Sequence, residues 1–433
     1  MRKSFVVLML TGLIALISFN AWFFYSSSRD KEGTTLSAPV HLTLLANQSW
    51  IGRSFLQKAI FEYEQSTGVQ VDIQAVPSNS AASLMKKKFA AGVLPDIVLS
   101  SGGAALDAFH PTNNFVNMDD EIWVKNLQPY VLPLVTNNFS VYGFPLWEGA
   151  LSGIIYNKQI FAKYHLQVPQ NEEQFFQVCE TLRANGIIPV YMAFRDIWPI
   201  GLEYGLDTVV AQDDSRIVRL NRNQLTLPQI PEMLQLLNWY NRLAQSGDLG
   251  PSFETNNWDG QADALASGKY AMAIGTDTFL YNELQVNHPG ASDDFGLMPF
   301  YFGFNERGSY ARNDLVAMYV NQKSKYFKEA MDFVDMSANP EKINEIYDGV
   351  YTEPLFKTLR TNKLTPEYAD VLATGQSDRI VPASANLIIG FSPIDLAVPL
   401  QEMMLGETTP EQTLQAIENI RYSTAQNQGT PGF

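Results

Sequence analysis

Four places in the sequence set an indole ring beside a side chain that forms hydrogen bonds. They are Asn47 with Trp50, Trp147 with Glu148, Asp196 with Trp198, and Trp258 between Asn257 and Asp259. A pyranose presents an apolar face of C–H groups and a rim of hydroxyls, so a flat indole covers the face while carboxylates and amides bond the rim. Each Trp taken alone fits a place in a hydrophobic core equally well. The four pairs together favour a sugar or another polyol as the ligand.

Motifs of catalysis and metal binding are missing from the sequence. It has no Gly-rich phosphate loop ending in Lys and Ser or Thr, no His-Glu-x-x-His, no G-x-S-x-G and no calcium loop. The four histidines, His41, His110, His165 and His288, lack the spacing of metal ligands. We therefore predict no catalytic residue, no metal and no cofactor. A carbohydrate-active enzyme with two opposed carboxylates stays open as an alternative, since the chain carries 45 acidic residues.

The stretch from Pro145 to Gly153 is expected to hold Trp147 and Glu148 at a junction between two parts of the fold. Pro145 keeps the residue before it extended and cannot donate to a strand ladder. Gly149 and Gly153 let the backbone bend without a steric penalty from Cβ. The sequence therefore predicts a strand that leaves one lobe, a bend that carries the Trp and the carboxylate, and a helix that enters a second lobe.

Apolar periodicity before this junction alternates between strand and helix. We expect strands at 41–45, 69–76 and 94–99 and helices at 54–65 and 81–91. Repeated strand-helix-strand units are typical of a parallel sheet with helices on its faces. Ligands of such sheets bind beyond the carboxyl ends of the strands, which is where Trp50, Ser100 and Ser101 fall.

The same alternation continues after the junction. It predicts helices at 161–164, 172–184, 231–244, 327–336 and 410–421 and strands at 270–274, 295–299 and 315–320. A chain of 433 residues is long for one hydrophobic core. Length and pattern together predict an α/β fold with two lobes.

The first residues have the pattern of an export signal. Two basic residues precede an uncharged run of 21 residues, Phe5 to Tyr25, which at about 1.5 Å per residue spans a bilayer core of about 30 Å. Phe19 occupies a place where a cleavage site needs a small side chain. We expect an uncleaved anchor at 1–28 and a tether at 29–39, with the rest of the chain on the outer face of the cytoplasmic membrane. A cleaved signal and a free periplasmic protein are the alternative.

Charge and cysteine content restrict the partners. The formal net charge is −15, so nucleic acid, which needs a basic face, is not expected as a partner. Cys179 is the single cysteine of the sequence, which leaves no disulfide and no thiol near the start to carry a lipid. We expect a monomer that is attached to the membrane through its N-terminal segment.

Several short motifs resemble those of one family. In chain order they are EQSTGVQV at 64–71, AAGVLPDI at 90–97, YGFP at 142–145, YNK at 156–158, LQVP at 166–169, ASGKYAM at 266–272, EAMDF at 329–333 and LGETTPE at 405–411. Each motif alone is weak, and the set is specific because of its order and spacing over nearly the whole chain after residue 40. The chain is similar to the family 1 extracellular solute-binding proteins, the sugar-capturing components of ABC importers.

The resemblance implies a two-lobed fold like that of periplasmic binding proteins, with a mostly parallel sheet flanked by helices in each lobe. The implied boundaries are 40–149 plus about 320–365 for the N-terminal lobe, and 150–319 plus about 366–433 for the C-terminal lobe. Crossover hinges would join the lobes at about 148–152, 313–320 and 362–371. Lobes joined in this way close around a ligand held between them.

The resemblance also implies which residues line the cleft. Carried over by position, they are Trp50, Ser100, Ser101, Trp147, Glu148, Asp196, Trp198, Trp258 and Asp277, with Arg312, Asn313 and Tyr351 as further candidates. For Arg312 an ion pair between the lobes is the alternative, because a guanidinium forks equally well onto a carboxylate.

The implied function is capture of a carbohydrate outside the cell and its delivery to the permease of an ABC importer. The expected partners are a sugar or oligosaccharide and the permease subunits in the membrane. A sensor subunit that passes a ligand signal to a membrane histidine kinase is an alternative, since an uncleaved anchor suits that role.

Overall fold

The computed structural model describes residues 40–77, 81–196, 198–391 and 393–433. The anchor expected at 1–28 and the tether expected at 29–39 lie outside these residues. Within the described ranges, no helix combines the length and the apolar character needed to cross a membrane. The fold below is that of residues 42–433, which form one unit, together with the first residue of strand β1.

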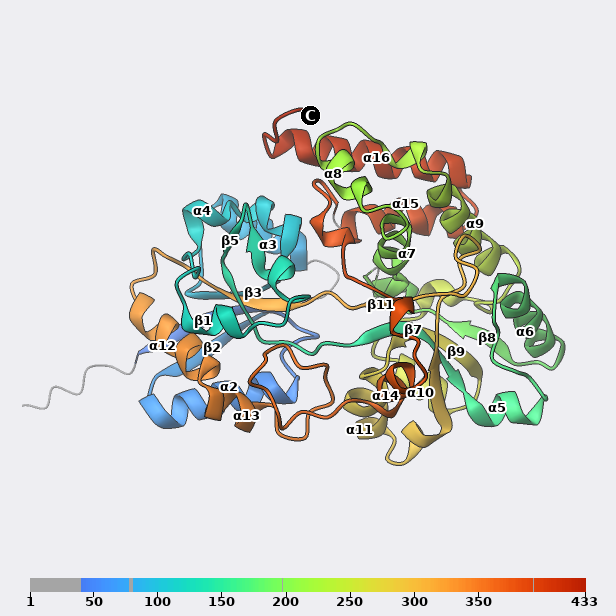
Figure 1. The fold of residues 1–433 in the computed structure, drawn as a ribbon, viewed down its shortest axis with the longest axis horizontal. Coiled ribbons are helices and arrows are strands. Elements are labelled where there is room, and N and C mark those ends of the chain that lie inside the picture. The colour runs from blue at the N-terminus through green and yellow to red at the C-terminus, as the bar shows by residue number, and fades with distance from the viewer. Residues whose placement is uncertain (1–39, 78–80, 197, 392) are drawn as a thin grey trace, which may run out of the picture. The chain divides into compact units, whose positions relative to one another are not determined.

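The first sheet has five strands in the order β2, β1, β3, β12 and β6 (Figure 1). In that order they span Gln70–Val76, His41–Asn47, Ile97–Ser101, Val316–Val320 and Gly143–Pro145. β1 and β3 run parallel, whereas β12 runs antiparallel to both β3 and β6. The chain therefore leaves this sheet after β6 and returns to it much later with β12.

Helices lie on both sides of the first sheet. They are α2 (Ser54–Thr67), α3 (Ala81–Ala90), α4 (Pro111–Asn114), α12 (Phe327–Ala338) and α13 (Pro340–Ile346). Figure 1 shows α2, α12 and α13 on one side and α3 and α4 on the other. A small ribbon of β4 (Thr136–Asn137) and β5 (Ser140–Val141) precedes β6. The core between these elements includes Leu44, Phe55, Val98 and Tyr319.

The second sheet has the strand order β13, β11, β7, β9 and β8, and β10 also pairs with β7. In that order, with β10 last, the strands span Ile380–Val381, Tyr310–Arg312, Leu151–Asn157, Tyr270–Thr276, Ile188–Tyr191 and Phe295–Met298. β7 runs antiparallel to β9, β10 and β11, whereas β8 is parallel to β9 and β11 is parallel to β13. β7 is therefore the strand on which this sheet is assembled.

The remaining helices surround the second sheet (Figure 1). They are α5 (Lys158–Lys163), α6 (Glu172–Ala184), α7 (Leu202–Val210), α8 (Ser215–Asn221), α9 (Pro231–Gln245), α10 (Gln261–Ala266), α11 (Gln285–Asn287), α14 (Pro366–Ala373), α15 (Pro393–Met404) and α16 (Pro410–Asn427). α9, α15 and α16 pack on one another. The second core includes Phe175, Trp239 and Leu414 from these helices.

The predicted α/β class, with two sheets flanked by helices, is confirmed. The strand directions are more mixed than the mostly parallel arrangement that we expected. A short link joins β6 of the first sheet to β7 of the second, and another joins β11 of the second sheet to β12 of the first. A parallel neighbour requires a crossover of a dozen or more residues, so strands that arrive through short links have no such constraint on their direction.

Local signals in the sequence set several helix ends. α2 ends at a glycine, because Gly68 has a φ of 74° and its N–H donates to the Glu64 carbonyl oxygen. α6 covers the predicted residues 172–184, and the Asn171 side chain caps it by accepting from the Gln174 N–H at 3.0 Å. These ends are fixed by contacts within one turn, which is why the sequence alone locates them.

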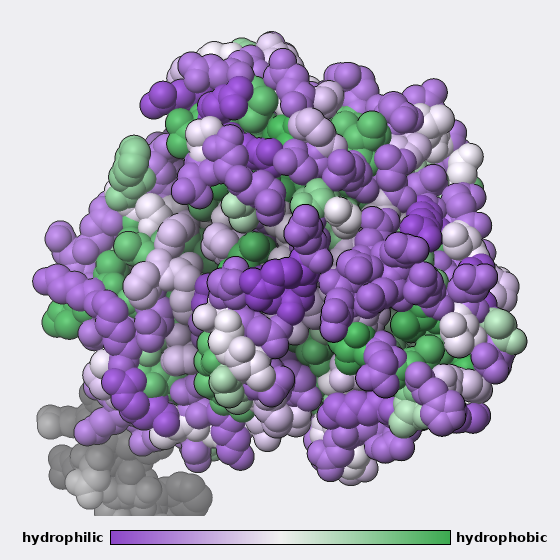
Figure 2. Space-filling view, turned by 45° about the vertical axis from the view of Figure 1, so that its right-hand side comes forward, coloured by the Kyte–Doolittle hydropathy of each residue, from purple (hydrophilic) through white to green (hydrophobic). Residues whose placement is uncertain are grey.

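Polar side chains cover most of the face shown in Figure 2, and apolar side chains form separate patches on it. A hydrophilic surface agrees with the 45 acidic and 30 basic residues of the chain.

Asp96 joins three neighbouring strands at one end of the first sheet. Its Oδ2 accepts from the N–H and the hydroxyl of Thr43, both at 2.8 Å, and its Oδ1 accepts from the Ser324 hydroxyl at 2.5 Å. Thr43 lies in β1, Asp96 directly precedes β3, and Ser324 follows β12. The Pro-Asp motif of the sequence is therefore a structural clasp.

Replacing Asp96 with Ala should lower the free energy of unfolding by about 3 kcal/mol, because the partly buried donors of Thr43 and Ser324 lose a charged acceptor. Urea unfolding followed by circular dichroism measures the change. Asp120→Ala, at an exposed carboxylate, is the control and should change stability by less than about 0.5 kcal/mol. Equal stability of Asp96→Ala and the wild type would contradict the role of the clasp.

Candidate functional site

The turn after β1 presents Trp50. Asn47 Oδ1 accepts from the Ser49 N–H at 3.0 Å, and the Trp50 N–H donates to the Asn47 carbonyl oxygen at 3.0 Å. Bonds of this kind between an Asn side chain and the following backbone favour a tight turn. The partly buried Trp50 ring meets the Trp147 ring edge-on, with centroids 5.6 Å apart and planes at 69°.

Trp147 lies in the link between β6 and β7 and is 7% exposed. Its ring is edge-on to Phe55, with centroids 5.7 Å apart. Its carbonyl oxygen accepts from the Tyr347 hydroxyl at 2.7 Å. Trp147 is therefore held firmly by the first core and supports the more exposed ring of Trp50.

Arg53, which directly precedes α2, has its guanidinium beside the Trp147 ring. Its Cζ lies 5.6 Å from the centroid of the Trp147 ring. Its Nη1 lies 2.7 Å from Glu283 Oε1 and 3.4 Å from Glu148 Oε1. The guanidinium thus pairs with two carboxylates, one from the link before β7 and one from the segment after β9.

The pKa values of Arg53 and Glu283 are shifted by burial and by the neighbouring charges. Burial acts to lower the pKa of Arg53, but the carboxylates of Glu148 and Glu283 outweigh it, so that the pKa of Arg53 is raised. Burial raises the pKa of Glu283, the Arg53 charge opposes this rise, and Glu148 adds to it. The guanidinium is therefore held in its charged form by the two partners that surround it.

Glu283 lies on a π-helical turn, Leu280–Leu284. Such turns are rare and occur frequently at functional sites. Asn282, on the same turn, donates from its Nδ2 to Glu148 Oε2 at 2.6 Å and to the Tyr351 carbonyl oxygen at 3.1 Å. Two consecutive residues of this turn are thus linked to the carboxylate of Glu148. Asn282 donates to it directly, and Glu283 shares Arg53 with it.

Tyr351 lies beside the same turn. Its ring stacks on Tyr281, with centroids 4.3 Å apart and planes at 28°. The Tyr281 hydroxyl donates to Glu367 Oε2 at 2.9 Å. The structure therefore places this predicted site residue next to Asn282 and Glu283.

Trp258 donates hydrogen bonds to two carboxylates, those of Glu283 and Asp196. Its Nε1 donates to Glu283 Oε2 at 2.8 Å, and its backbone N–H donates to Asp196 Oδ2 at 2.5 Å. The partly exposed ring is edge-on to Phe279, with centroids 5.2 Å apart. Trp258 and Asp196 came from separate Trp and carboxylate pairs in the sequence, and the fold brings them into one set.

We call this set the indole–carboxylate cluster. Its members are Trp50, Arg53, Trp147, Glu148, Asp196, Trp258, Asn282 and Glu283. Elements of both sheets supply them. Indole rings beside carboxylates and an amide can cover the apolar face of a ligand and bond its hydroxyls at the same time.

The contacts described above do not include three of the predicted site residues. Ser100 and Ser101 end β3, and Ser100 is buried. Burial raises the pKa of Asp314 to about 6, and the Ser101 hydroxyl opposes this rise. Trp198 begins the short 3-10 turn Trp198–Ile200, and its side chain lies outside the described part of the chain. Their role in binding stays a prediction.

Asn313 ties together the links between the two sheets. Its Oδ1 accepts from the Ala150 N–H at 2.7 Å, and its Nδ2 donates to the Glu148 carbonyl oxygen at 2.9 Å. In the same place the Gly149 N–H donates to the Thr352 hydroxyl at 2.8 Å. Three passages of the chain therefore meet at this junction.

Asp277 has both carboxyl oxygens engaged at the junction. Oδ1 accepts from the Leu151 N–H at 2.8 Å, and Oδ2 accepts from the Thr365 hydroxyl at 2.5 Å. The residue is 1% exposed. Burial raises the pKa of Asp277 from 3.8 to about 7, and these two bonds oppose the rise.

Arg312 forms the forked ion pair that the sequence left open. Its Nε lies 3.1 Å from Glu353 Oε2, its Nη2 lies 3.0 Å from Glu353 Oε1, and its Cζ lies 4.7 Å from the centroid of the Tyr130 ring. Glu353 also pairs through its backbone with Gly149. The fork of Arg312 is thus directed at the junction.

Sequence reasoning missed Arg53, Asn282 and Glu283. The available signal for Arg53 was its place in the expected loop between Trp50 and a helix. Asn282 and Glu283 carried no local signal, because the hydrogen bond from Asn282 to Glu148 joins residues 134 positions apart. Only the folded chain brings them together.

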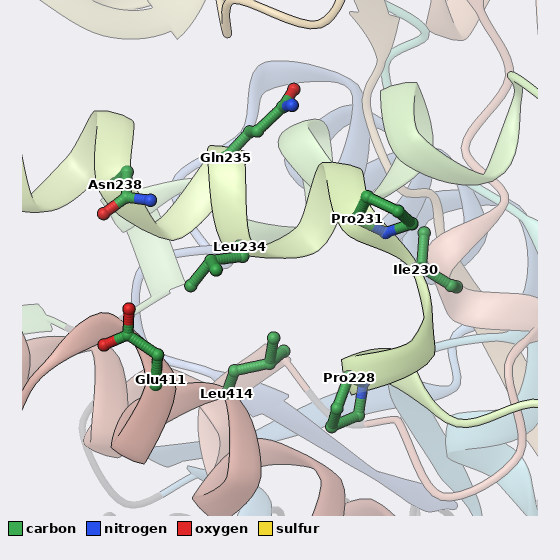
Figure 3. Close-up of a pocket in the computed structure, with 8 residues that line it drawn as sticks. All are labelled: Pro228, Ile230, Pro231, Leu234, Gln235, Asn238, Glu411 and Leu414. Atoms are coloured by element: carbon green, nitrogen blue, oxygen red, sulfur yellow. The ribbon is translucent and has the colours of Figure 1, made fainter.

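A separate surface pocket of about 450 Å³ lies between α9 and α16. Figure 3 shows Leu234 and Leu414 facing each other across it. The full lining is Pro228, Ile230, Pro231, Leu234, Gln235, Asn238, Glu411 and Leu414. This lining contains no indole ring and none of the predicted site residues, so the pocket is distinct from the candidate site.

Comparison with known families gives one match that covers most of the chain. Residues 48–343 match the sequence profile of the family described as bacterial extracellular solute-binding protein. The matched range contains every member of the indole–carboxylate cluster and most of the junction.

The sequence identity to individual relatives is low, and the share of the chain that they cover differs from one to the next. The multiple sugar-binding protein of Streptococcus mutans is 21% identical over 363 residues, which are 82% of this chain and 84% of that protein. The melibiose/raffinose/stachyose-binding protein MelE of Bacillus subtilis is 25% identical over 202 residues, 45% of this chain and 44% of that protein. A sugar transporter from Bacillus licheniformis, solved in complex with stachyose, has a TM-score of 0.71 at 18% identity and covers 89% of this chain and 100% of its own. The last similarity concerns the fold.

The buried carboxyl of Asp277 should make stability depend on pH. Between pH 3.8 and about 7 the folded protein holds a proton on Asp277 that the unfolded chain has released. The contribution of this proton to the free energy of unfolding is therefore full below that window and is lost as the pH rises through it. Asp277→Asn cannot ionise, so its stability should fall less steeply than that of the wild type over the same window, as measured by urea unfolding at several pH values.

Asp378→Asn is the control for this measurement, since Asp378 forms an exposed pair with Arg307. It should keep the slope of the wild type. If Asp277→Asn also kept that slope, Asp277 would not hold the proton.

Proposed function

The chain belongs to the bacterial extracellular solute-binding protein family, and we propose that it captures a sugar or oligosaccharide and delivers it to the permease of an ABC importer. Two relatives are named for binding multiple sugars and for binding melibiose, raffinose and stachyose. Proteins of this family are exported and bind solutes without transforming them. The carbohydrate-active enzyme considered above is therefore set aside.

The indole–carboxylate cluster is the observation that supports a sugar as the ligand. The rings of Trp50 and Trp147 cross at 69°, so they cannot both lie flat against one sugar ring. Because Trp147 is 7% exposed and packed against Phe55, we assign the open face to Trp50 and the supporting role to Trp147. Carboxylate and amide groups beside these rings offer acceptors and donors to hydroxyls.

The proposed binding residues fall into two groups by their contacts. Trp50, Trp147, Glu148, Asp196 and Trp258 belong to the cluster, with Ser100, Ser101, Trp198 and Tyr351 proposed as further lining. We assign Asp277, Arg312 and Asn313 to the junction, because their polar side-chain atoms already bond backbone or side-chain partners there.

We further propose that the chain forms two lobes that move about the junction. The proposed lobes are 40–149 plus about 320–365 and 150–319 plus about 366–433. In support, one hydrophobic core draws on residues from 42–147 and 315–359 with Ala383, and another on residues from 154–311 and 385–417. The links between them are the segments that Asn313, Thr352 and Asp277 hold together. Motion about such links is the hinge type of closure.

The N-terminal segment is proposed to export the chain and to remain as its anchor. The uncharged run Phe5 to Tyr25 is long enough to span a bilayer, and cleavage with release to the periplasm is the alternative. The intact mass of the exported protein separates the two. A sensor role is tested by capture from membranes, where a histidine kinase in place of permease subunits would argue against transport.

Thermal unfolding in the presence of a panel of neutral mono- and oligosaccharides tests the proposed function. A sugar that binds the folded protein alone should raise the melting temperature, because at 100 times its Kd it adds about 2.7 kcal/mol to stability. Raffinose and stachyose are natural members of the panel, given the names of the relatives. If no sugar raises the melting temperature, the proposal is wrong.

Trp50→Ala should weaken the binding of the sugar found in this panel by about 2 kcal/mol, because the ligand loses a central aromatic surface. Isothermal titration calorimetry measures the affinity. Phe61→Ala is the control, since this ring lies in α2, is 56% exposed and has no contact with the cluster among those described. Unchanged affinity of Trp50→Ala would remove Trp50 from the site.

A further inference from the structure

We propose that the Nε–H of Arg53 binds the sugar directly, and that the pairing of Arg53 with Glu148 and Glu283 restricts the site to sugars without a carboxylate. This inference rests on the proposed function and adds to it a ligand class and a specificity-determining residue. Neither was visible in the sequence.

The first argument is the hydrogen-bonding capacity of the guanidinium. An Arg side chain has five N–H donors in a rigid plane. Nη1 of Arg53 is directed at Glu283, at 2.7 Å. The Nε atom is buried, and none of the residues that the structure describes places an acceptor on it. A buried donor without an acceptor is unfavourable. An oxygen of a sugar that reached Nε when the proposed lobes part would satisfy this donor without displacing a protein partner.

The second argument is the fixed direction of this donor. Cζ of Arg53 lies 5.6 Å from the centroid of the Trp147 ring, and Trp147 is itself packed against Phe55. Glu148 and Glu283 hold the other end of the guanidinium. An N–H group that is held on both sides can donate to an oxygen in one direction only, which is the requirement for a specificity-determining contact.

The third argument concerns charge. The side chains of Arg53, Glu148 and Glu283 are 15%, 7% and 22% exposed, so solvent screens them weakly. One cation faces two carboxylates there, and Asp196 is joined to Glu283 through Trp258. Within the cluster, carboxylates therefore outnumber the guanidinium by three to one.

A uronic acid brought to this place would add a further carboxylate to an excess of negative charge. The charge of Arg53 is already matched by Glu148 and Glu283, so it cannot balance an incoming anion. Repulsion between like charges at short range disfavours such a ligand strongly. A neutral hydroxyl or ring oxygen meets no such repulsion and still accepts from Nε.

Arg53→Lys tests the direct contact. Lys keeps the positive charge between Glu148 and Glu283 and lacks the Nε–H. We expect about tenfold weaker binding of the neutral sugar that binds the wild type in the thermal panel, as the loss of one hydrogen bond to a charged donor predicts. The melting temperature without sugar should stay close to that of the wild type and shows that the variant is folded.

Arg242→Lys is the matched control. Arg242 is half exposed, its Cζ lies 3.8 Å from the centroid of the Phe176 ring, and it pairs with Glu172 at 3.7 Å. It therefore makes the same kinds of contact as Arg53 but lies outside the cluster. Its replacement should leave the affinity for the sugar unchanged.

Titration with galacturonic acid and trigalacturonic acid tests the exclusion of carboxylates. At pH 7 these ligands should bind the wild type at least about tenfold more weakly than the neutral sugar. Glu283→Gln removes one negative charge and keeps an oxygen that can accept from Trp258 Nε1. In this variant the ratio of neutral to uronate affinity should fall, and added salt should reduce the difference between the two proteins.

The outcomes separate this inference from the proposed function. If the wild type binds no neutral sugar, the proposed function itself fails. If the wild type binds a neutral sugar and Arg53→Lys binds it equally well, Arg53 does not contact the ligand. If uronates bind the wild type as tightly as neutral sugars, the exclusion of carboxylates is wrong.

Discussion

A guanidinium that leaves water must keep its carboxylate partners, and this constraint organises the candidate site. Arg53 lies in the turn before α2, while Glu148 and Glu283 come from the link before β7 and from a π-helical turn after β9. Removing one member of a buried ion pair leaves an uncompensated charge, which is strongly unfavourable. The three residues therefore have to be positioned together, and the rings of Trp147 and Trp258 are positioned with them through Arg53 and Glu283.

The junction between the two sheets supplies the geometry that this ion pair needs. Links between the sheets are short, so their backbone groups cannot all find partners within a strand ladder. Side chains take over that role. Asn313 accepts from the Ala150 N–H and donates to the Glu148 carbonyl oxygen, and Asp277 accepts from the Leu151 N–H. A rotation about these links would change the distance from Arg53 to Glu283 and would leave Trp147 packed against Phe55. Binding and closure would then depend on the same few contacts.

Much of the fold could be predicted because its signals are local. Gly68 ends α2 through its own left-handed conformation, and Asn171 starts α6 through a bond to the next turn. The strand directions were not predictable in the same way, since β7 and β12 arrive through links whose geometry depends on both sheets. Among the residues predicted to bind the ligand, Asp277 and Arg312 have side chains that are directed at the junction. A sequence position near a strand end does not specify which neighbour a side chain will meet.

The sequence by itself determined the α/β class, several of the strands and helices, and the pairing of indole rings with polar groups. Each of these depends on residue types and on spacings within a few turns of chain. The sequence predicted a helix after the bend at Gly149, where the structure has strand β7. The tertiary structure decided that Arg53, Glu148, Asn282 and Glu283 form one network, and that Asp277 is buried with both oxygens bonded. The physical reason is that hydrogen bonds and ion pairs act over about 3 Å. Residues far apart in the sequence come within that distance only when the whole chain has folded.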